Sequence, residues 1–487
     1  MLDGSGTRKL GGRDSLRAFQ RFFAWSLIAL CVSLFSSRAH AYAWMIKHTY
    51  AGCPACHADP SGGELLTEYG RAQSDLLLRM RYGKPGGGDS SNPSRRSVAL
   101  SSERRTDANS GADDEAKSGD DSKGDDAETA TKSSEAGEAK PEDATEEEAA
   151  PAASESSDDG GVSTSSGFLW GAVTPPEWLL LGGSYRHLTI FRPSLESKKF
   201  TTFPMMADLY GQAQFGSFRV GGSIGAARVG VGSPYARAAQ VTAGQGNQWN
   251  LLSRSHWLGY DLSGTMLLRA GHLNLPFGVR IPEHTMWVRQ ATRTDRESSQ
   301  QGGVALAYNG ESIRGEVMLI AGNFQVNPDK YRERGYSLYA EYLTSSRTAI
   351  GISSLVTSAK KDRVTLDPSV VRQAHGAFVR TTFTDSLVLF VEADALLRTE
   401  REAGYVGFAQ LDFEAIQGLH FMATGELLDE GHNTFTNDAR TPGAGKPRGG
   451  GWLSVDWFCL PHVEVRADLF SRQGDVTTVL GQLHVFL

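Results

Sequence analysis

Two cysteines and a histidine near the start of the chain form the pattern with the clearest chemistry. Cys53 and Cys56 are separated by two residues, and His57 follows directly. This C-x-x-C-H spacing is typical of covalent haem attachment, because the two thiols add to the haem vinyl groups and the adjacent imidazole coordinates the iron. The sequence therefore predicts one covalently bound haem c, attached through Cys53 and Cys56, with His57 as the proximal iron ligand.

Three other chemistries use similar spacing but fit the flanking sequence less well. A structural zinc site needs two further ligands at matching spacing, and none lies nearby. A thioredoxin-like dithiol normally stands in a βαβ context, which is absent here. A plain disulfide between Cys53 and Cys56 is the third alternative. In an exported chain, haem attachment explains the histidine as well as the two cysteines.

The second axial ligand of the iron stays open. Met80 follows the motif on a stretch whose apolar residues have helical spacing, and it is the first candidate. His48 and Met45, upstream of the motif, are the others, and a barrel residue or an open position also fits the sequence. The simple alternative for Met80 is packing on an apolar helix face.

The first 41 residues indicate export. A basic segment precedes an apolar run at 22–35, and Ala39-His40-Ala41 forms a small-x-small cleavage site. This arrangement is typical of a secretory signal peptide. No later stretch approaches the roughly 20 uninterrupted apolar residues of a transmembrane helix. We expect a signal peptide at 1–41 and a mature chain that begins at Tyr42.

The mature chain divides into three regions. Residues 42–83 combine the cysteine motif with aromatic and apolar residues, and we predict a small α-helical monohaem cytochrome c segment there. Residues 84–166 are rich in Ser, Asp, Glu, Ala, Gly and Lys and have almost no aromatics. Such a segment cannot bury enough apolar surface to fold, which predicts a disordered acidic linker. Residues 167–487 have a different pattern, in which runs of alternating apolar and polar residues are separated by turns.

Alternating apolar and polar residues in 167–487 predict an all-β domain, a transmembrane antiparallel β-barrel. The clearest run is 463–469, in which one face is apolar (Val463, Val465, Ala467, Leu469) and the other is charged (Glu464, Arg466, Asp468). We expect the charged face to line the lumen of the barrel, together with Glu392, Asp394, His420 and Glu426. A barrel of this size leaves an aqueous lumen.

Loop lengths favour a barrel over a soluble β-sandwich. Short turns are expected at 215–218, 262–265, 309–312, 344–347, 384–386, 416–419 and 460–462. They alternate with longer connections, among them 230–250, 278–302 and 429–449. Outer-membrane barrels have short periplasmic turns and longer extracellular loops. The pattern predicts about 16 strands, with both ends of the barrel domain on the periplasmic side.

Charge argues against one class of partner. The formal net charge is −7 at pH 7, and no basic patch is present to neutralise phosphates, so nucleic acid is not expected. The predicted location is the outer membrane, with lipid around the barrel and the haem segment in the periplasm or the lumen. No feature of the sequence decides whether the chain forms an oligomer.

The N-terminal motifs resemble those of a known family, the fused monohaem cytochrome–porins of outer membranes. Lys47-His48-Thr49 precedes the haem motif, and Tyr69-Gly70-Arg71 follows it, where that family has Arg-Gln-Thr-like and Phe-Gly-Arg-like segments. The resemblance implies a sixteen-stranded porin-like barrel and oxidation of extracellular Fe(II). The long acidic linker and His48 depart from the family pattern. Separately, 268–278 is similar to a strand-and-loop segment of phosphate-selective-type porins.

Two functions are consistent with these observations. In the first, the single haem moves electrons between an extracellular donor such as Fe(II) and periplasmic c-type cytochromes. In the second, the barrel is a diffusion porin, and the tethered haem acts separately in the periplasm as an electron shuttle or sensor. Both assign a redox-active haem to the chain, and neither assigns a catalytic residue.

Overall fold

The computed structural model describes residues 56–60, 62, 64–78, 80, 168–169, 172–197, 199–229, 248–281, 285–323, 329–399, 401–432 and 445–487. The predicted signal peptide, the predicted linker at 84–166, and the residues Met45, His48 and Cys53 lie outside these ranges and stay predictions. Within them, no helix has the length and apolar character needed to cross a bilayer.

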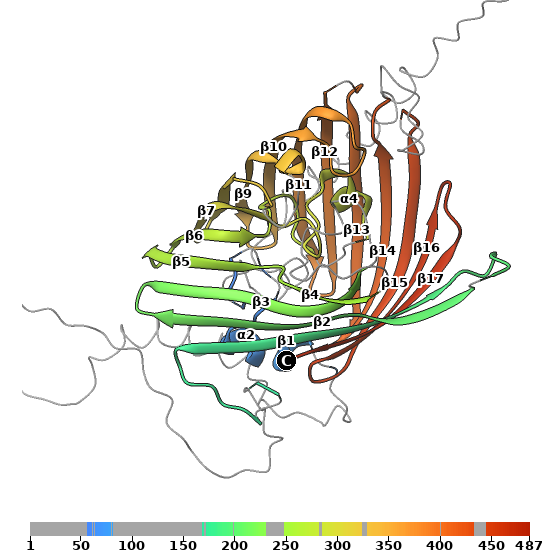
Figure 1. The fold of residues 1–487 in the computed structure, drawn as a ribbon. Helices are drawn as coiled ribbons and strands as arrows, with labels where there is room; N and C mark the ends of the chain where they lie inside the picture. The colour runs from blue at the N-terminus through green and yellow to red at the C-terminus, as the bar shows by residue number, and fades with distance from the viewer. Residues whose placement is uncertain are drawn as a thin grey trace, which may run out of the picture. The chain divides into compact units, whose positions relative to one another are not determined.

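Seventeen antiparallel strand segments form one closed sheet (Figure 1). Consecutive segments pair along the chain, and β1 closes the sheet by pairing with both β2 and β17. Both β4 and β5 pair with β3, so they occupy one position together and the barrel has 16 strand positions. The predicted antiparallel β-barrel of about 16 strands is confirmed.

The strand segments are β1 (Leu179–Phe191), β2 (Phe200–Phe215), β3 (Phe218–Val229), β4 (Gln248–Leu252), β5 (His256–Ser263), β6 (Met266–Leu273), β7 (Gln301–Asn309), β8 (Ile313–Ile320), β9 (Arg334–Ser345), β10 (Thr348–Lys361), β11 (Pro368–Thr384), β12 (Leu387–Arg398), β13 (Gly404–Ile416), β14 (Leu419–Asp429), β15 (Arg448–Leu460), β16 (Val463–Arg472) and β17 (Thr478–Phe486). Four short helical segments accompany them in the described ranges: α2 (Glu68–Gln73), the π-helix η3 (Ser74–Leu78), α4 (Trp287–Thr292) and the 3-10 helix η4 (Asp329–Tyr331).

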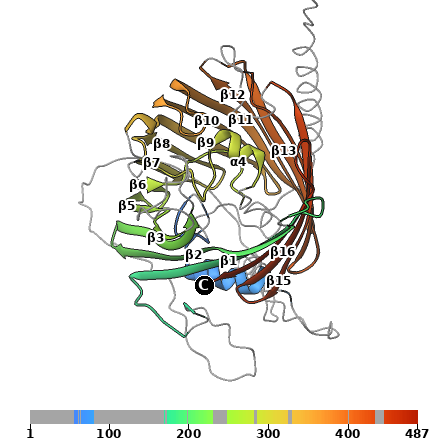
Figure 2. The ribbon, with the colours of Figure 1, turned by 45° about the vertical axis from the view of Figure 1, so that its right-hand side comes forward.

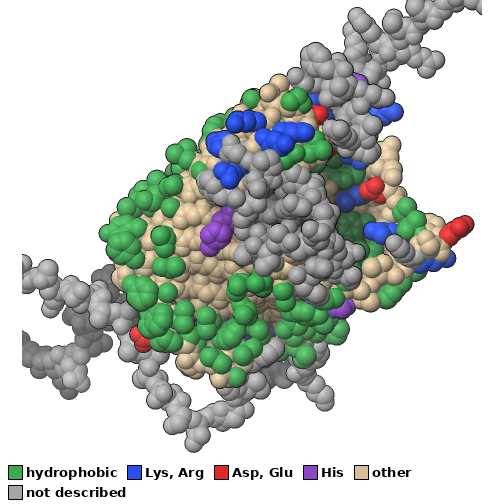
Figure 3. Space-filling view, viewed as in Figure 1, with side chains coloured by type: hydrophobic (Ala, Val, Ile, Leu, Met, Phe, Trp, Pro, Cys, Tyr) green, Lys and Arg blue, Asp and Glu red, His purple; other side chains and the backbone are tan. Residues whose placement is uncertain are grey.

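The outer wall of the barrel is apolar, and the inner wall is polar. In β16, Val465 and Leu469 are 40% and 45% exposed, whereas Arg466 and Asp468 on the opposite face are 9% and 7% exposed. Hydrophobic side chains gather over the outer wall formed by β2 to β7 (Figure 3). A closed barrel satisfies its backbone hydrogen bonds internally and presents an apolar surface to lipid. The protein is therefore an outer-membrane β-barrel, as predicted.

All seven predicted short turns connect neighbouring strands. Between β13 and β14, for example, Gly418 has a φ of 82°, a left-handed value that glycine adopts without steric cost. Because consecutive strands are antiparallel, these turns all lie at one end of the barrel. Outer-membrane barrels place their short turns in the periplasm, so we call this the periplasmic end.

The connection between β6 and β7 differs from the prediction. The sequence predicts 278–302 as an extracellular loop, but residues 274–281 and 285–300 run inside the barrel and carry α4 (Figure 2). The backbone N–H of Val279 donates to Glu392 on β12 at 2.7 Å, and that of Trp287 donates to Glu426 on β14 at 2.6 Å. These bonds hold the described parts of the connection, which we call the lumen loop (274–281 and 285–300), against the far wall.

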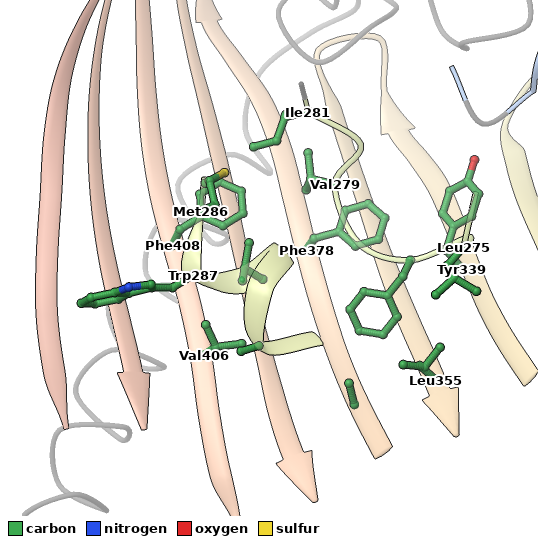
Figure 4. Packing of buried hydrophobic residues seen from close by; sticks show 14 of the residues in the cluster. Leu275, Val279, Ile281, Met286, Trp287, Tyr339, Leu355, Phe378, Val406 and Phe408 are labelled. Carbon is green, nitrogen blue, oxygen red and sulfur yellow. The ribbon is translucent and has the colours of Figure 1, made fainter. Parts of the chain in front are cut away.

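Apolar side chains of the lumen loop occupy part of the lumen, which the sequence predicts to be aqueous. Val279, Ile281 and Met286 pack beside the wall residues Phe378 and Phe408 (Figure 4). The predicted lumen-facing residues are nevertheless buried on the inner wall: Glu392, Asp394, His420, Glu426, Arg466 and Asp468. The inner wall is polar as predicted, but part of the lumen is a hydrophobic core rather than an aqueous channel. Burial of these apolar side chains offsets the cost of ordering the loop.

Candidate functional site

Cys56 and His57 of the C-x-x-C-H motif lie in a small hairpin. His57 pairs with Leu66 in an antiparallel bridge, and the N–H of Thr67 donates to the carbonyl oxygen of Cys56 at 2.9 Å. Thr67 then caps α2, because its hydroxyl accepts a hydrogen bond from the N–H of Gly70 at 3.0 Å. The predicted helix therefore begins directly beside the motif, and the hairpin fixes the backbone of Cys56 and His57 relative to it.

Gly70 brings α2 into contact with the motif. A Cβ atom on Gly70 would stand 2.8 Å from Cα of Cys56, and it would lie nearer still to the carbonyl oxygen of that residue. Only a residue without a side chain permits this approach. The glycine of the Tyr69-Gly70-Arg71 motif thus has a structural reason, which is close packing of the helix on the backbone of Cys56.

The hairpin lies against the inner wall of the barrel. Ala58 and Leu65 form a small buried cluster with Tyr210 of β2, and Leu180 of β1 packs on the same cluster. Leu65 also borders Gly182 of β1, where an added Cβ would stand 2.9 Å from the leucine side chain. Tyr210 belongs to the inward face of β2, because its neighbour Leu209 on the outward face is 56% exposed. The segment that carries Cys56 and His57 is thus seated inside the barrel.

Buried ion pairs also hold the hairpin against the inner wall. We call this contact of the hairpin with the wall the seat. A carboxylate oxygen of Asp59 lies 2.6 Å from Nη1 of Arg269 on β6, whose other terminal nitrogen lies 2.6 Å from Glu316 on β8. Arg280, from the lumen loop, donates to the carbonyl oxygen of Pro60 at 3.2 Å and pairs with Glu316 at 2.9 Å. The Arg269 side chain is 0% exposed. Opposite charges at these distances offset part of the desolvation cost of Arg269, and loss of Asp59 would leave Arg269 with only one of its two carboxylate partners.

Glu64 makes the third wall contact. The hydroxyl of Ser255, in the break between β4 and β5, donates to the Glu64 carboxylate at 2.7 Å. Burial raises the pKa of Glu64 from its ordinary value of 4.5 to about 7, and the bond from Ser255 opposes this shift only in part. The nearby carboxylates of Asp59 and Asp208 raise the pKa further.

Met80 lies at the periplasmic end of β15. Its backbone N–H donates to the carbonyl oxygen of Phe458 at 3.0 Å, and the indole N–H of Trp457 donates to its sulfur at 3.3 Å. Coordination of iron by Met80 would replace the contact with Trp457. The assignment of Met80, His48 or Met45 as sixth ligand stays a prediction.

The residues present are compatible with a covalent haem. Cys56 supplies a thiol and His57 an imidazole from the same hairpin, and both residues are only partly buried. Among the residues that the structure describes, no group of three or more His, Cys, Asp and Glu side chains could hold a metal ion. Haem iron needs only one or two protein ligands. Cys53, the other predicted attachment residue, lies outside the described residues.

Sequence reasoning missed the residues that seat the hairpin. Asp59, Glu64 and Arg269 stand in no recognisable motif, and Asp59 is separated from Arg269 by the whole predicted linker and by β1 to β5. The one available signal was an arginine at an inward position of β6, where a partner of opposite charge is expected. That signal does not identify the partner.

Comparisons with known proteins give likenesses in fold at low sequence identity. No family model matches the chain, and no curated protein matches it. The outer-membrane protein OmpT of Vibrio cholerae in its trimer form is 12% identical, with a TM-score of 0.47, over 63% of this chain and 99% of that one. The outer-membrane channel DcaP of Acinetobacter baumannii is 12% identical, with a TM-score of 0.43, over 63% and 97%. OmpF of Salmonella typhi, in complex with daunomycin, is 10% identical, with a TM-score of 0.46, over 63% and 97%.

Proposed function

We propose that this outer-membrane barrel is an electron-transfer protein with one haem c, attached through Cys53 and Cys56 and coordinated by His57. With the haem held by these residues, the protein would carry electrons from an extracellular donor to c-type cytochromes in the periplasm. Fe(II) is the donor implied by the resemblance to the fused monohaem cytochrome–porins. The observation that supports the proposal best is the seat of the Cys56–His57 hairpin on the inner wall, held by the Asp59–Arg269 ion pair.

The depth of the seat matters for electron transfer. Arg269 and Glu316 lie near the periplasmic ends of β6 and β8, whose first residues are Met266 and Ile313. At about 3.3 Å per residue and a tilt of about 40°, Arg269 stands roughly 10 Å above the periplasmic turns. The apolar band of such a barrel is about 25 Å tall. The hairpin that would hold the haem therefore lies within the membrane but close to the periplasmic mouth, where an acceptor protein could approach.

The residues of the chain position the cofactor and exclude solvent. When bound, the haem supplies a reversible one-electron change at its iron. The hairpin, α2 and the ion pairs hold the backbone of Cys56 and His57 in one place relative to the wall. The lumen loop packs apolar side chains across the barrel on the other side. This packing disfavours a wide diffusion channel, which is the alternative function.

Sealed vesicles test the proposal. The purified full-length protein is reconstituted with oxidised soluble cytochrome c inside, and Fe(II) is added outside under anaerobic conditions. We expect reduction of the internal cytochrome with the wild-type protein and none with His57→Ala. His187→Ala is the matched control, because His187 lies on β1 and contacts Tyr185 and Thr202, away from the hairpin. Fe(II) that leaves both the barrel haem and the internal cytochrome oxidised would refute the proposed donor and direction.

A further inference from the structure

Arg71 is a buried cation next to the haem motif. It follows Gly70 in α2, and only 2% of its surface is exposed. Its Nε and Nη2 atoms are buried and make no hydrogen bond to the residues that the structure describes. The side chain points to β1, where Nη2 lies 3.8 Å from the position that a Cβ of Gly182 would occupy.

A buried guanidinium in this state is energetically unfavourable. Burial lowers the pKa of Arg71, and Glu68 on the exposed side of α2 raises it only in part. An arginine nevertheless keeps its charge in proteins. Burial of a charge is costly unless an opposite charge and hydrogen bonds compensate it. An anion with at least two acceptor oxygens would satisfy the fork of donors that Arg71 presents.

Other arginines around the hairpin already have such partners. Arg269 pairs with Asp59 and Glu316, and Arg280 pairs with Glu316. Arg71 differs from them because no salt bridge to it is formed within the described part of the chain. The described residues therefore leave the Nε and Nη2 donors of Arg71 available to a further anion.

We infer that Arg71 binds a propionate of the haem attached at Cys56. This inference rests on the proposed function. Gly70 holds α2 in contact with the backbone of Cys56, so the next residue stands within a side-chain length of the attachment point. A haem carries two propionate carboxylates at one edge, and a guanidinium binds a carboxylate through two parallel hydrogen bonds. Arg71 is a positioning residue for the cofactor, and it also keeps the propionate ionised.

The electrostatic consequence is measurable without an activity assay. A cation at the propionate stabilises the reduced haem, which has one positive charge fewer than the oxidised haem, and lowers the pKa of the propionate. Without Arg71, the haem potential should fall. The propionate should then take up a proton in the accessible pH range, and more readily in the reduced state. The potential would consequently decrease as pH rises through that range.

Spectroelectrochemical titration of the full-length protein in detergent, from pH 5 to pH 9, tests this inference. We expect Arg71→Ala to retain covalent haem, to have a lower midpoint potential, and to gain a pH dependence that the wild type lacks. Arg71→Lys keeps the charge without the fork and should give a smaller shift. It is also the variant to measure if Arg71→Ala does not fold. Arg219→Ala is the control, since Arg219 already pairs with Asp261 at 2.8 Å near the same end of the barrel.

The outcomes separate the two proposals. Covalent haem in the wild type, measured as the pyridine haemochrome, is required by the proposed function, and its absence would refute that function. If the haem is present but the potential and its pH dependence are the same in the wild type, Arg71→Ala and Arg71→Lys, the propionate assignment is wrong. Arg71 would then be a packing residue beside Gly182 of β1.

Discussion

The close approach of α2 to the haem motif predicts that Gly70→Ala destabilises the site. Helix propensity alone predicts the opposite, because alanine in a helix interior is favoured over glycine by about 1 kcal/mol. Ordinary van der Waals contact begins at 3.4 Å, but the new methyl group would stand 2.8 Å from the Cα of Cys56. The helix or the motif must therefore move by more than about half an ångström, and overpacking of this kind costs about 1–3 kcal/mol or more. We expect a net loss of about 1–2 kcal/mol.

Tryptic cleavage after Arg71 measures this loss. Arg71 is buried, so the protease cuts only when α2 opens, and the cleavage rate follows the population of the open form. A loss of about 1.4 kcal/mol corresponds to a tenfold increase in that rate. Gly264→Ala is the matched control, because a Cβ at Gly264, in the turn between β5 and β6, would meet no atom within 4 Å. Cleavage of Gly70→Ala at the wild-type rate or more slowly would refute the packing argument.

Three further predictions concern the seat and the linker. Asp59→Asn removes one partner of a buried pair but leaves Arg269 with Glu316, so the segment should loosen by about 2–3 kcal/mol. The same protease assay measures this change, with Asp261→Asn as the control at a part-exposed pair. Because the pKa of Glu64 is raised from 4.5 to about 7, its protonated form favours the seated state. Seating should weaken as pH rises from 4.5 through 7, by up to about 3 kcal/mol, and Glu64→Gln should remove this dependence. A pH profile of cleavage that is the same in both proteins would contradict the assignment. Replacement of 84–166 by a Gly/Ser linker of roughly 20 residues should preserve electron transfer in vesicles, whereas a freely roaming shuttle would lose reach to its partners.

The barrel was predictable because its signals are local. Alternation with a period of two sets the inward and outward faces of a strand, and short turns set its ends. In β16 the alternation from Val463 to Leu469 predicts which residues face lipid and which face the lumen, and the exposures agree. Each such signal needs only about ten consecutive residues.

The position of the lumen loop inside the barrel was not predictable, because it depends on packing partners that are distant in the sequence. Leu273, Leu275, Phe277, Val279 and Ile281 alternate as they would in a strand, so the sequence does not distinguish a buried loop from a continuing wall. Their burial depends on partners from distant strands, such as Phe378. Loop residues inside a barrel have the composition of a core.

In the candidate site, the cofactor was predictable from a local motif, but its location in the barrel was not. The spacing of Cys53, Cys56 and His57 predicts the cofactor from five consecutive residues. Its location in the barrel depends on the pairing of Asp59 with Arg269, and a single arginine in a strand does not show which carboxylate it meets. Tyr69-Gly70-Arg71 was recognisable as a motif, but the reason for its glycine appears only in the packing on Cys56.

The seat of the hairpin on β1, β2 and β6 constrains how the protein is assembled. The seam of the barrel is the pairing of β1 with β17, which joins the first and last strands of the domain. Residues 56–60, 62 and 64–67 precede β1 in the chain and lie inside the closed wall, where a bulky enzyme cannot surround them once they are seated. A maturation enzyme that links haem to Cys53 and Cys56 needs access to both thiols. We therefore expect haem attachment in the periplasm to precede the seating of this segment, so that the barrel receives a finished cytochrome.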